Sequence, residues 1–319
     1  MASDPATAPT VSFDDLLAPP VDENLEARRP SFWIPLLVGV GASALMLASS
    51  WLGGLRLPLQ NLWNAQTLPG DMPIALLALS QYEVFSVFAA VLLGGVVAGL
   101  GVRMLRRWRP MRAGAAALGV LLVHAVVTVQ SFAVLGDGLG VTDGTAGTMQ
   151  LMYFAGMLGA VVLGILLAQL SVLLTTRRST APAALAVALS GVWVGEWIGT
   201  VVIGVFGPSP PMIFIDALRW VAAVVVGVAL VWCGVRPWGR IFVWVAGLLT
   251  LWVLPAMITA VAYPLGTRAF GGDVREMSAA AAQIFPMALE ATVAPVVVAA
   301  VIGVVGTVVR MLVGRRSRE

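Results

Sequence analysis

The feature that most constrains this chain is a succession of long, almost purely apolar segments. A helix needs about 20 apolar residues to cross the hydrocarbon core of a bilayer, and only helices and closed barrels pair all their backbone polar groups there. The sequence holds eight such segments, which predict an all-α, polytopic integral membrane protein with eight transmembrane helices. The sixth segment is the shortest and is expected to begin a few residues early, near Phe214. The predicted spans are Phe32–Leu52, Val84–Val102, Ala113–Leu135, Leu151–Leu174, Ala183–Val205, Trp220–Val235, Ile241–Tyr263 and Ala291–Val313.

The composition excludes the soluble classes of protein. Of the 319 residues, 59% are hydrophobic and 11% are charged, and the mean hydropathy is +0.94. A soluble domain is nearer half apolar and one quarter charged, so this chain has too little polar surface to cover a globule. A pI of about 9.7 would otherwise suggest a nucleic-acid partner. Because the placement of the arginines, described below, explains this pI, we expect no nucleic-acid partner. We predict that the lipid bilayer surrounds the protein.

Residues 1–30 differ from everything that follows. They combine acidic side chains with prolines and small residues and contain no long apolar run. Such a segment cannot bury enough apolar surface to fold by itself, and it lacks the basic start and short apolar core of a signal peptide. We predict a disordered, acidic cytoplasmic tail over residues 1–30.

The placement of the arginines predicts the orientation. If the eight spans alternate in direction, fifteen of the 19 basic residues, all arginine, fall on one side and four on the other. Cytoplasmic loops are enriched in basic residues, so we predict that both termini are cytoplasmic. Arginine without lysine, in a chain rich in alanine, valine and glycine, is typical of a GC-rich bacterial genome. The expected location is therefore the bacterial plasma membrane.

The loops predicted on the outer side are longer than the cytoplasmic ones, and long loops often carry function. Within them, Met72–Gln81 and Val274–Met287 are apolar enough to predict short interfacial or re-entrant helices. The chain shows no glycine-rich phosphate loop of the Walker type. Any ATPase that drives this protein would therefore be a separate chain.

Two halves of the chain show weak internal similarity. The run Ala89–Arg103 recurs 133 residues later as Ala222–Arg236, with 7 of 15 positions identical. Internal repeats are common in transporters, and a duplication here predicts two parallel four-helix repeats. The halves would be residues 31–180 and 181–319, with a site between them. The alternative is chance similarity among helices rich in alanine, valine and glycine.

Two titratable residues lie near the predicted middle of the membrane. Glu196 is central in the fifth span, and His124, the only histidine, is central in the third. A central carboxylate costs about 2.5–3.5 kcal/mol on insertion scales, so such residues usually have a partner or a function. A Glu196–His124 pair would be able to hold or pass a proton. The structural alternative is that Glu196 hydrogen-bonds to Thr200 and that His124 is a neutral core residue.

The fifth span carries two patterns besides its glutamate. Gly191, Gly195 and Gly199 recur every four residues, which places them on one helix face and lets another backbone approach closely. We interpret them mainly as a packing face. Trp193 and Trp197 are also four residues apart, on a different face. Either they line an aromatic cavity, or they only pack against neighbouring side chains.

A polar stripe runs along the third span. His124, Thr128 and Ser131 follow one another at spacings of four and three, which places them on one helix face. Polar residues in a span face protein or water rather than lipid. The stripe leads from the midplane toward the outer surface, and we interpret it as an access path.

Charged residues also gather at the predicted outer boundary of the membrane. Charges at this depth are inexpensive compared with midplane charges, so solvation alone explains them. The functional alternative is an entrance to a pathway or a site for a lipid phosphate. The candidate entrance residues are Glu83, Asp216, Arg219 and Glu290.

Together these features predict a membrane transport protein, either a secondary transporter or a permease subunit, that moves a small solute with proton coupling through Glu196. One alternative is a non-catalytic scaffold subunit of a cell-envelope complex, held by a partner membrane subunit. Another is an enzyme that processes a lipid at the outer face with Glu83, Asp216 and Arg219. A single histidine and a single cysteine cannot build a metal cluster or a bis-histidine haem site, so we expect no cofactor.

Overall fold

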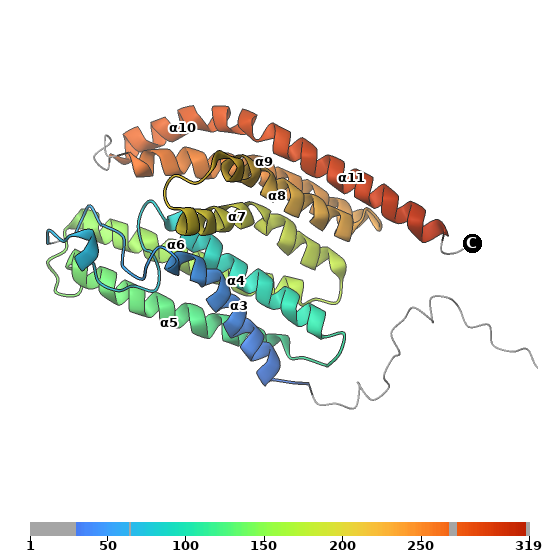
Figure 1. Cartoon of the computed structure of the whole chain (residues 1–319), viewed down its shortest axis with the longest axis horizontal. Coiled ribbons are helices and arrows are strands. Elements are labelled where there is room, and N and C mark those ends of the chain that lie inside the picture. Colours follow the sequence, from blue (N-terminus) through green and yellow to red (C-terminus); the bar gives the residue numbers. More distant parts are fainter. Residues whose placement is uncertain (1–29, 64, 268–272, 317–319) are drawn as a thin grey trace, which may run out of the picture.

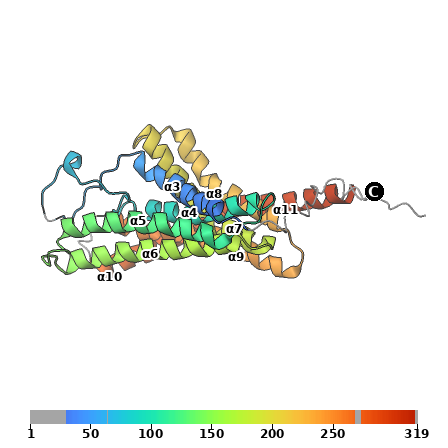
Figure 2. The same ribbon diagram turned by 90° about the horizontal axis from the view of Figure 1, so that it is seen from below.

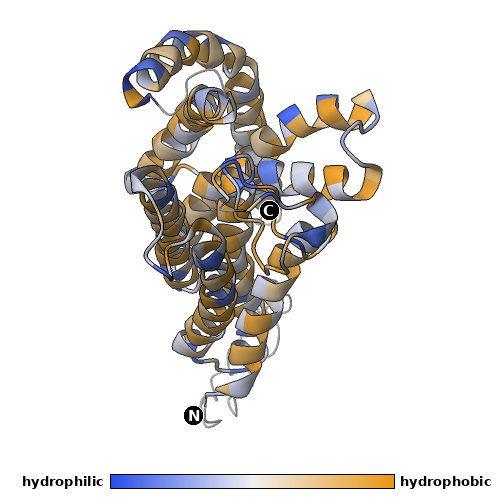
Figure 3. Cartoon of the chain, turned by 90° about the vertical axis from the view of Figure 1, so that its left-hand side faces the viewer, coloured by the Kyte–Doolittle hydropathy of each residue, from blue (hydrophilic) through white to orange (hydrophobic). Residues whose placement is uncertain are grey.

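The computed structural model describes residues 30–63, 65–267 and 273–316 and shows a bundle of long helices (Figure 1). Within these residues, eight helical stretches are long and apolar enough to cross a membrane, and no strand forms. The prediction of an all-α, polytopic membrane protein is confirmed. Most of the helix surface is hydrophobic (Figure 3), as contact with lipid requires. The helices are α3 (Trp33–Trp51), α4 (Val84–Leu105), α5 (Ala113–Leu139), α6 (Thr148–Thr175), α7 (Thr180–Phe206), α8 (Met212–Cys233), α9 (Ile241–Gly266), α10 (Val274–Ala291) and α11 (Val293–Arg316), with short 3-10 helices η1 (Pro69–Asp71) and η2 (Trp238–Arg240).

Most helix boundaries lie close to the ends of the predicted spans. The sixth span, α8, begins at Met212, in agreement with the early start expected near Phe214. The tail predicted over residues 1–30 lies, except for Pro30, outside the described residues.

The last helical stretch is longer than predicted because two helices follow each other almost without interruption. α10 ends at Ala291 and α11 begins at Val293, so residues 274–313 form a stretch of 40 residues. At 1.5 Å per residue this stretch is about 60 Å long, roughly twice the thickness of the hydrocarbon core. It forms a long arc over one side of the bundle (Figure 1). α10 contains the short helix predicted over Val274–Met287, and it packs mainly against α9.

The other short helix, predicted over Met72–Gln81, does not form. Residues 74–79 are non-helical, and every second side chain in them is buried: Ala75, Leu77 and Leu79. The backbone N–H of Ala75 donates to the carbonyl of Leu55 at 2.8 Å, which ties the segment to the chain that precedes it. The prediction was wrong because side chains that alternate in burial produce an apolar segment without any helix face.

The helices form two groups that meet where α7 packs against α4 (Figure 1). In the first group α4 packs along α3 and α6, and α3 packs along α5. In the second group α8 packs along α7 and α11, and α7 packs along α9. The neighbours of each helix thus follow the same order in residues 31–180 and in residues 181–319. This shared pattern favours the duplication, which stays a prediction.

Glycines allow unusually close helix contacts in the first group. A Cβ on Gly39 would collide with the carbonyl oxygen of Ala116 in α5, and a Cβ on Gly119 would collide with that of Leu36 in α3. A Cβ on Gly95 would likewise collide with the backbone of Ala168 in α6. Small residues let helix backbones approach within a membrane, where packing drives association. The helices α3 to α6 therefore form a tightly packed unit.

The two ends of the bundle differ. At the end that we call the arginine end, Arg103 of α4 donates hydrogen bonds to backbone carbonyls of residues 175–179, at the C-terminus of α6. Its guanidinium also lies 5.3 Å above the ring of Trp232 in α8. Helix C-termini favour cations because their last carbonyls lack partners, so Arg103 joins both helix groups here. The opposite end, which we call the loop end, carries residues 53–63, 65–83 and 140–147 (Figure 2).

Candidate functional site

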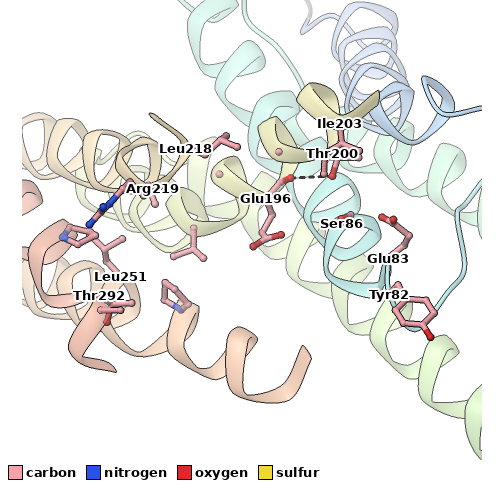
Figure 4. Close-up of a pocket in the computed structure, with 17 residues that line it drawn as sticks. Tyr82, Glu83, Ser86, Glu196, Thr200, Ile203, Leu218, Arg219, Leu251 and Thr292 are labelled. Carbon is pink, nitrogen blue, oxygen red and sulfur yellow. Dashed lines mark hydrogen bonds between the residues drawn. The ribbon is translucent and has the colours of Figure 1, made fainter. Parts of the chain in front are cut away.

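A cavity of about 780 Å³ lies in the half of the bundle nearer the loop end. Both helix groups contribute to its walls: the start of α4, the second half of α7, the first half of α8, the middle of α9 and the junction of α10 with α11 (Figure 4). Small-molecule sites typically have this size, with mostly apolar walls and a few polar groups. The polar lining residues are Tyr82, Glu83, Ser86, Glu196, Thr200, Arg219 and Thr292, and the apolar ones include Val192, Leu218, Leu251 and Pro255.

Glu196 brings a carboxyl group into this cavity from within a membrane-spanning helix. Its side chain extends from α7 into the cavity (Figure 4). The hydroxyl of Thr200, one turn later, donates to the backbone carbonyl of Glu196 at 3.1 Å. This is the usual bond of a helical threonine to the preceding turn. The alternative in which Thr200 hydrogen-bonds to the carboxylate is therefore not what the structure shows.

Glu83 lines the same cavity from the residue that precedes α4. Burial raises the pKa of Glu83 above its ordinary value of 4.5, and a hydrogen bond with Ser86 opposes part of this rise. Glu83 and Glu196 thus bring two carboxyl groups to the lining of one cavity, from different helix groups. Two carboxyl groups in one partly buried site favour a bound proton or cation.

Arg219 also lines the cavity, but its charge is turned away from the carboxyl groups. The guanidinium carbon lies 4.8 Å from the centroid of the Trp220 ring, within the range of a cation–π contact. Figure 4 shows the side chain pointing away from Glu196. Within the described ranges, Glu196 and Glu83 have no arginine as an electrostatic partner.

The packing of α7 against α8 explains why a cavity opens here. A Cβ on Gly191 would lie 2.7 Å from Cγ2 of Val226, so the two helices touch at this level. At Gly195 and Gly199 the nearest atoms belong to Leu218 and would lie 3.9 Å away. The glycine face therefore packs most tightly at Gly191, whereas Gly195 and Gly199 line the cavity. The tip that connects α7 to α8 stands away from the bundle in Figure 2.

Trp193 and Trp197 lie outside the cavity lining and pack against the first helix group. The ring centroid of Trp193 lies 4.5 Å from that of Phe88 in α4. The indole N–H of Trp197 donates to the carbonyl of Met46 in α3 at 2.8 Å. Of the two interpretations of this pair, packing is therefore the one that matches the structure.

The loop end of the polar stripe on α5 holds an irregular segment in place. The hydroxyl oxygen of Ser131 accepts the N–H of Leu77 at 2.8 Å. The side chain of Gln130 accepts the N–H of Leu76 and donates to the carbonyl of Ile74, both at 2.9 Å. These bonds supply partners to backbone groups that have no helix to pair them. Ser131 therefore binds the backbone of residues 74–79 at the position where the predicted access path would reach the outer surface.

His124 and Thr128 lie deeper in the first helix group and away from the cavity. His124 is fully buried, and within the described residues neither of its ring nitrogens has a hydrogen-bond partner; the same is true of the hydroxyl of Ser43. A Cβ on Gly94 would lie 3.2 Å from Nε2 of His124 and 3.1 Å from Oγ of Ser43. The pair of Glu196 with His124 therefore does not form.

The remaining two candidate entrance residues lie outside the lining. Asp216 of α8 and Glu290 of α10 are both exposed. The structure thus brings Glu83, Glu196 and Arg219 to one cavity and leaves Asp216 and Glu290 at the surface.

Sequence reasoning did not single out Tyr82, Ser86 or Thr292, which also line the cavity. Ser86 lies one turn after Glu83, a spacing that makes it a natural partner and that the sequence displays. Thr292 lies in the break between α10 and α11, and its hydroxyl donates to the carbonyl of Trp252 at 2.9 Å. No local pattern in the sequence predicts that contact, because it joins residues that are distant in the chain.

Among the described residues, no group of three histidine, cysteine, aspartate or glutamate side chains is placed to hold a metal ion. Comparison with protein-family models, with curated proteins and with solved structures finds no match. The residues of the cavity themselves are therefore the basis for a functional proposal.

Proposed function

We propose that this protein is a transporter that binds a small solute in the cavity and exposes it alternately to the two sides of the membrane. The observation that carries the proposal is Glu196, an ionisable side chain of a membrane-spanning helix that lines a cavity of about 780 Å³. Intramembrane carboxyl groups that face a cavity typically belong to substrate or proton pathways. In this proposal Glu196 carries either a proton or the solute, which couples the two movements.

The position of the cavity supports alternating access. Toward the arginine end it is backed by a buried hydrophobic cluster that includes Val192, Val226 and Leu230. Beyond this cluster, Arg103 ties the two helix groups together. A site that is closed toward one end is what one of two interconverting states of a transporter would present. With the arginine end cytoplasmic, as the arginine distribution predicts, the described state faces outward.

The outer part of α9 together with α10 is the wall best suited to move. None of the residues of α10 is buried, and its main contact is with α9. Pro255 in α9 and Thr292 at the α10–α11 break both line the cavity. A proline within a helix frees a backbone carbonyl and permits bending. These two points would act as hinges on which the hairpin swings over the cavity.

A cysteine-labelling experiment tests alternating access without knowledge of the solute. The chain has one cysteine, Cys233, so Cys233→Ser removes all native thiols. In this background Thr200→Cys places a thiol in the cavity lining, and Thr142→Cys places one on the exposed surface of the loop end. A membrane-impermeant maleimide is then applied to right-side-out and to inverted vesicles.

A transporter predicts that Thr200→Cys is labelled from both sides and that Thr142→Cys is labelled from the outer side only. Labelling of Thr200→Cys from one side only, at every pH between about 5 and 8, would overturn the proposal. The Thr142→Cys control also tests the predicted orientation, because labelling of that site from the cytoplasmic side would reverse it.

A second function, that of an assembly subunit, is favoured by α10 itself. A helix with no buried residue and an acidic, polar side offers a surface for another membrane protein. Mass determination of the native protein after gentle solubilisation separates the two functions. A self-contained transporter is expected as a monomer or homo-oligomer, whereas stoichiometric recovery with an envelope protein would favour the assembly subunit, and with an ATPase the permease subunit.

A further inference from the structure

We propose that the solute of this cavity is a lipophilic organic cation with a single positive charge. The proposal rests on the proposed transport function and specifies the chemistry of the same site. It follows from three properties of the cavity. Its lining has an excess of negative charge, its walls are mostly apolar, and its carboxyl groups have no arginine partner among the described residues.

The lining charge favours a monovalent cation. When both carboxyl groups are ionised, Glu83 and Glu196 bring two negative charges and Arg219 one positive charge. The guanidinium of Arg219 is occupied by the ring of Trp220 and points away from Glu196 (Figure 4). Counted over the whole lining, the two carboxylates exceed the guanidinium by one negative charge, and that guanidinium does not lie against either carboxylate. A single positive charge on the solute neutralises this excess charge, and an anion would meet repulsion in a partly desolvated site.

The walls favour an organic cation over a metal ion. Most of the lining is apolar, with Val192, Leu218, Leu251 and Pro255 around the carboxyl groups. A hard metal ion needs several oxygen ligands, and no suitable group of three ligand side chains occurs in the part of the chain that the structure describes. A cation with an apolar body would fill the volume and bury apolar surface. Tyr82 adds an aromatic ring at the margin, a further contact suited to cations.

The same geometry gives a balanced exchange. The cation binds beside the Glu196 carboxylate, and the proton that this carboxyl group carried leaves to water. One positive charge enters the site as another leaves it, so the exchange is electrically neutral. Return of the cavity to the first side with a proton on Glu196 completes the cycle. Bound cation and bound proton are therefore mutually exclusive on this residue.

Tetraphenylphosphonium and tetraphenylborate provide a matched pair of probes, because they have nearly the same shape and opposite charge. Binding of each is measured at equilibrium to the full chain in lipid nanodiscs, with empty nanodiscs as the reference for partition into lipid. We expect saturable binding of the phosphonium cation and none of the borate anion. We also expect release of about one proton per bound cation, read with a pH indicator in weak buffer.

Two variants localise the binding. Glu196→Gln removes the charge on the cavity and is expected to weaken cation binding at least about tenfold and to abolish proton release. Glu290→Gln makes the same change on the exposed face of α10, outside the lining, and is expected to bind as the wild type does. Equal binding of both probes, or cation binding unchanged in Glu196→Gln, would overturn the assignment.

The outcomes separate this inference from the proposed function. Cation binding together with one-sided labelling of Thr200→Cys would support the ligand class and refute transport. Two-sided labelling without binding of the cation would support transport and refute the ligand class. A variant that fails to fold is recognised by its elution profile and thermal unfolding, and Glu196→Asp, which keeps the charge, then serves as the test of charge dependence.

Discussion

Glu83 and Glu196 belong to different helix groups and line the same cavity. Glu83 precedes α4, and Glu196 lies within α7, more than a hundred residues later in the chain. Neither has an arginine partner among the described residues. Two carboxyl groups that line one cavity without a fixed counter-charge are poised to take up protons or a cation.

Glu196→Gln is expected to fold normally and to lose transport. The substitution keeps the size of the side chain and removes a charge from a partly buried site, so the free energy of unfolding should not fall. Uptake of tetraphenylphosphonium into proteoliposomes, driven by a pH gradient, should fall to the level of empty liposomes. Glu290→Gln is the control and should retain uptake. Full activity of Glu196→Gln would remove the role assigned to this carboxylate.

The wild type should lose stability as the pH rises through the raised pKa of Glu83. Burial raises this pKa above 4.5, so the folded state holds its proton at pH values where the unfolded state has released it. Stability is therefore highest at low pH and falls as the carboxyl group is forced to ionise in the buried site. Thermal unfolding of Glu83→Gln in the same detergent should lack this decrease, which begins above pH 4.5. An identical pH profile for both proteins would contradict the burial of this group.

Trp197→Phe is expected to weaken the attachment of α7 to α3. The phenyl ring keeps most of the packing, but the carbonyl of Met46 loses the N–H that now donates to it at 2.8 Å. That carbonyl keeps the Ser49 hydroxyl, which donates to it at 2.9 Å, so the substitution removes one hydrogen bond at a cost of about 0.5–1.5 kcal/mol. Chemical unfolding should report a loss within that range, whereas cation binding should persist because the ring lies outside the cavity lining. Loss of binding without loss of stability would place Trp197 in the site.

Gly95→Ala should be strongly destabilising, and Gly156→Ala should not. A Cβ on Gly95 would collide with the backbone of Ala168 in α6, which cannot move aside as a flexible side chain would. Overpacking of this kind costs about 1–3 kcal/mol. Gly156 lies on α6 with no atom within 4 Å of the added Cβ, and alanine is the better helix former. Unfolding of both variants side by side separates the effect of contact from that of helix propensity.

His124→Leu and Ser131→Ala should change stability in opposite directions. His124 is buried without a hydrogen-bond partner among the described residues, so an apolar replacement removes an unpaired polar group and should stabilise by about 1 kcal/mol. Ser131 accepts the N–H of Leu77, and its removal leaves that group unpaired at a cost of about 1–3 kcal/mol. Thermal unfolding in detergent checks both. A His124→Leu variant less stable than the wild type would show that the imidazole has a partner inside the protein.

Local periodicity anticipated some contacts but not the residues they reach. The four-residue spacing of Gly191, Gly195 and Gly199 predicts a packing face, and Gly191 does meet α8. That the other two glycines line a cavity depends on how α7 and α8 are placed against the remaining helices. The polar stripe of α5 likewise has the predicted spacing, but Ser131 meets a segment some fifty residues away in sequence.

The sequence by itself determined the class of the protein and the position of its spans. Transfer into lipid depends on the summed hydrophobicity of about 20 consecutive residues, a property that each segment carries without reference to the others. For the same reason the sequence alone singles out Glu196, because a carboxylate in the middle of a span is costly to insert into the membrane and usually has a function. Only the tertiary structure decided that Glu196 lines a cavity with Glu83 rather than pairing with His124, that the tryptophans lie outside the cavity lining, and that Met72–Gln81 is not a helix. Those outcomes depend on contacts between distant segments, which no local pattern of hydrophobicity encodes.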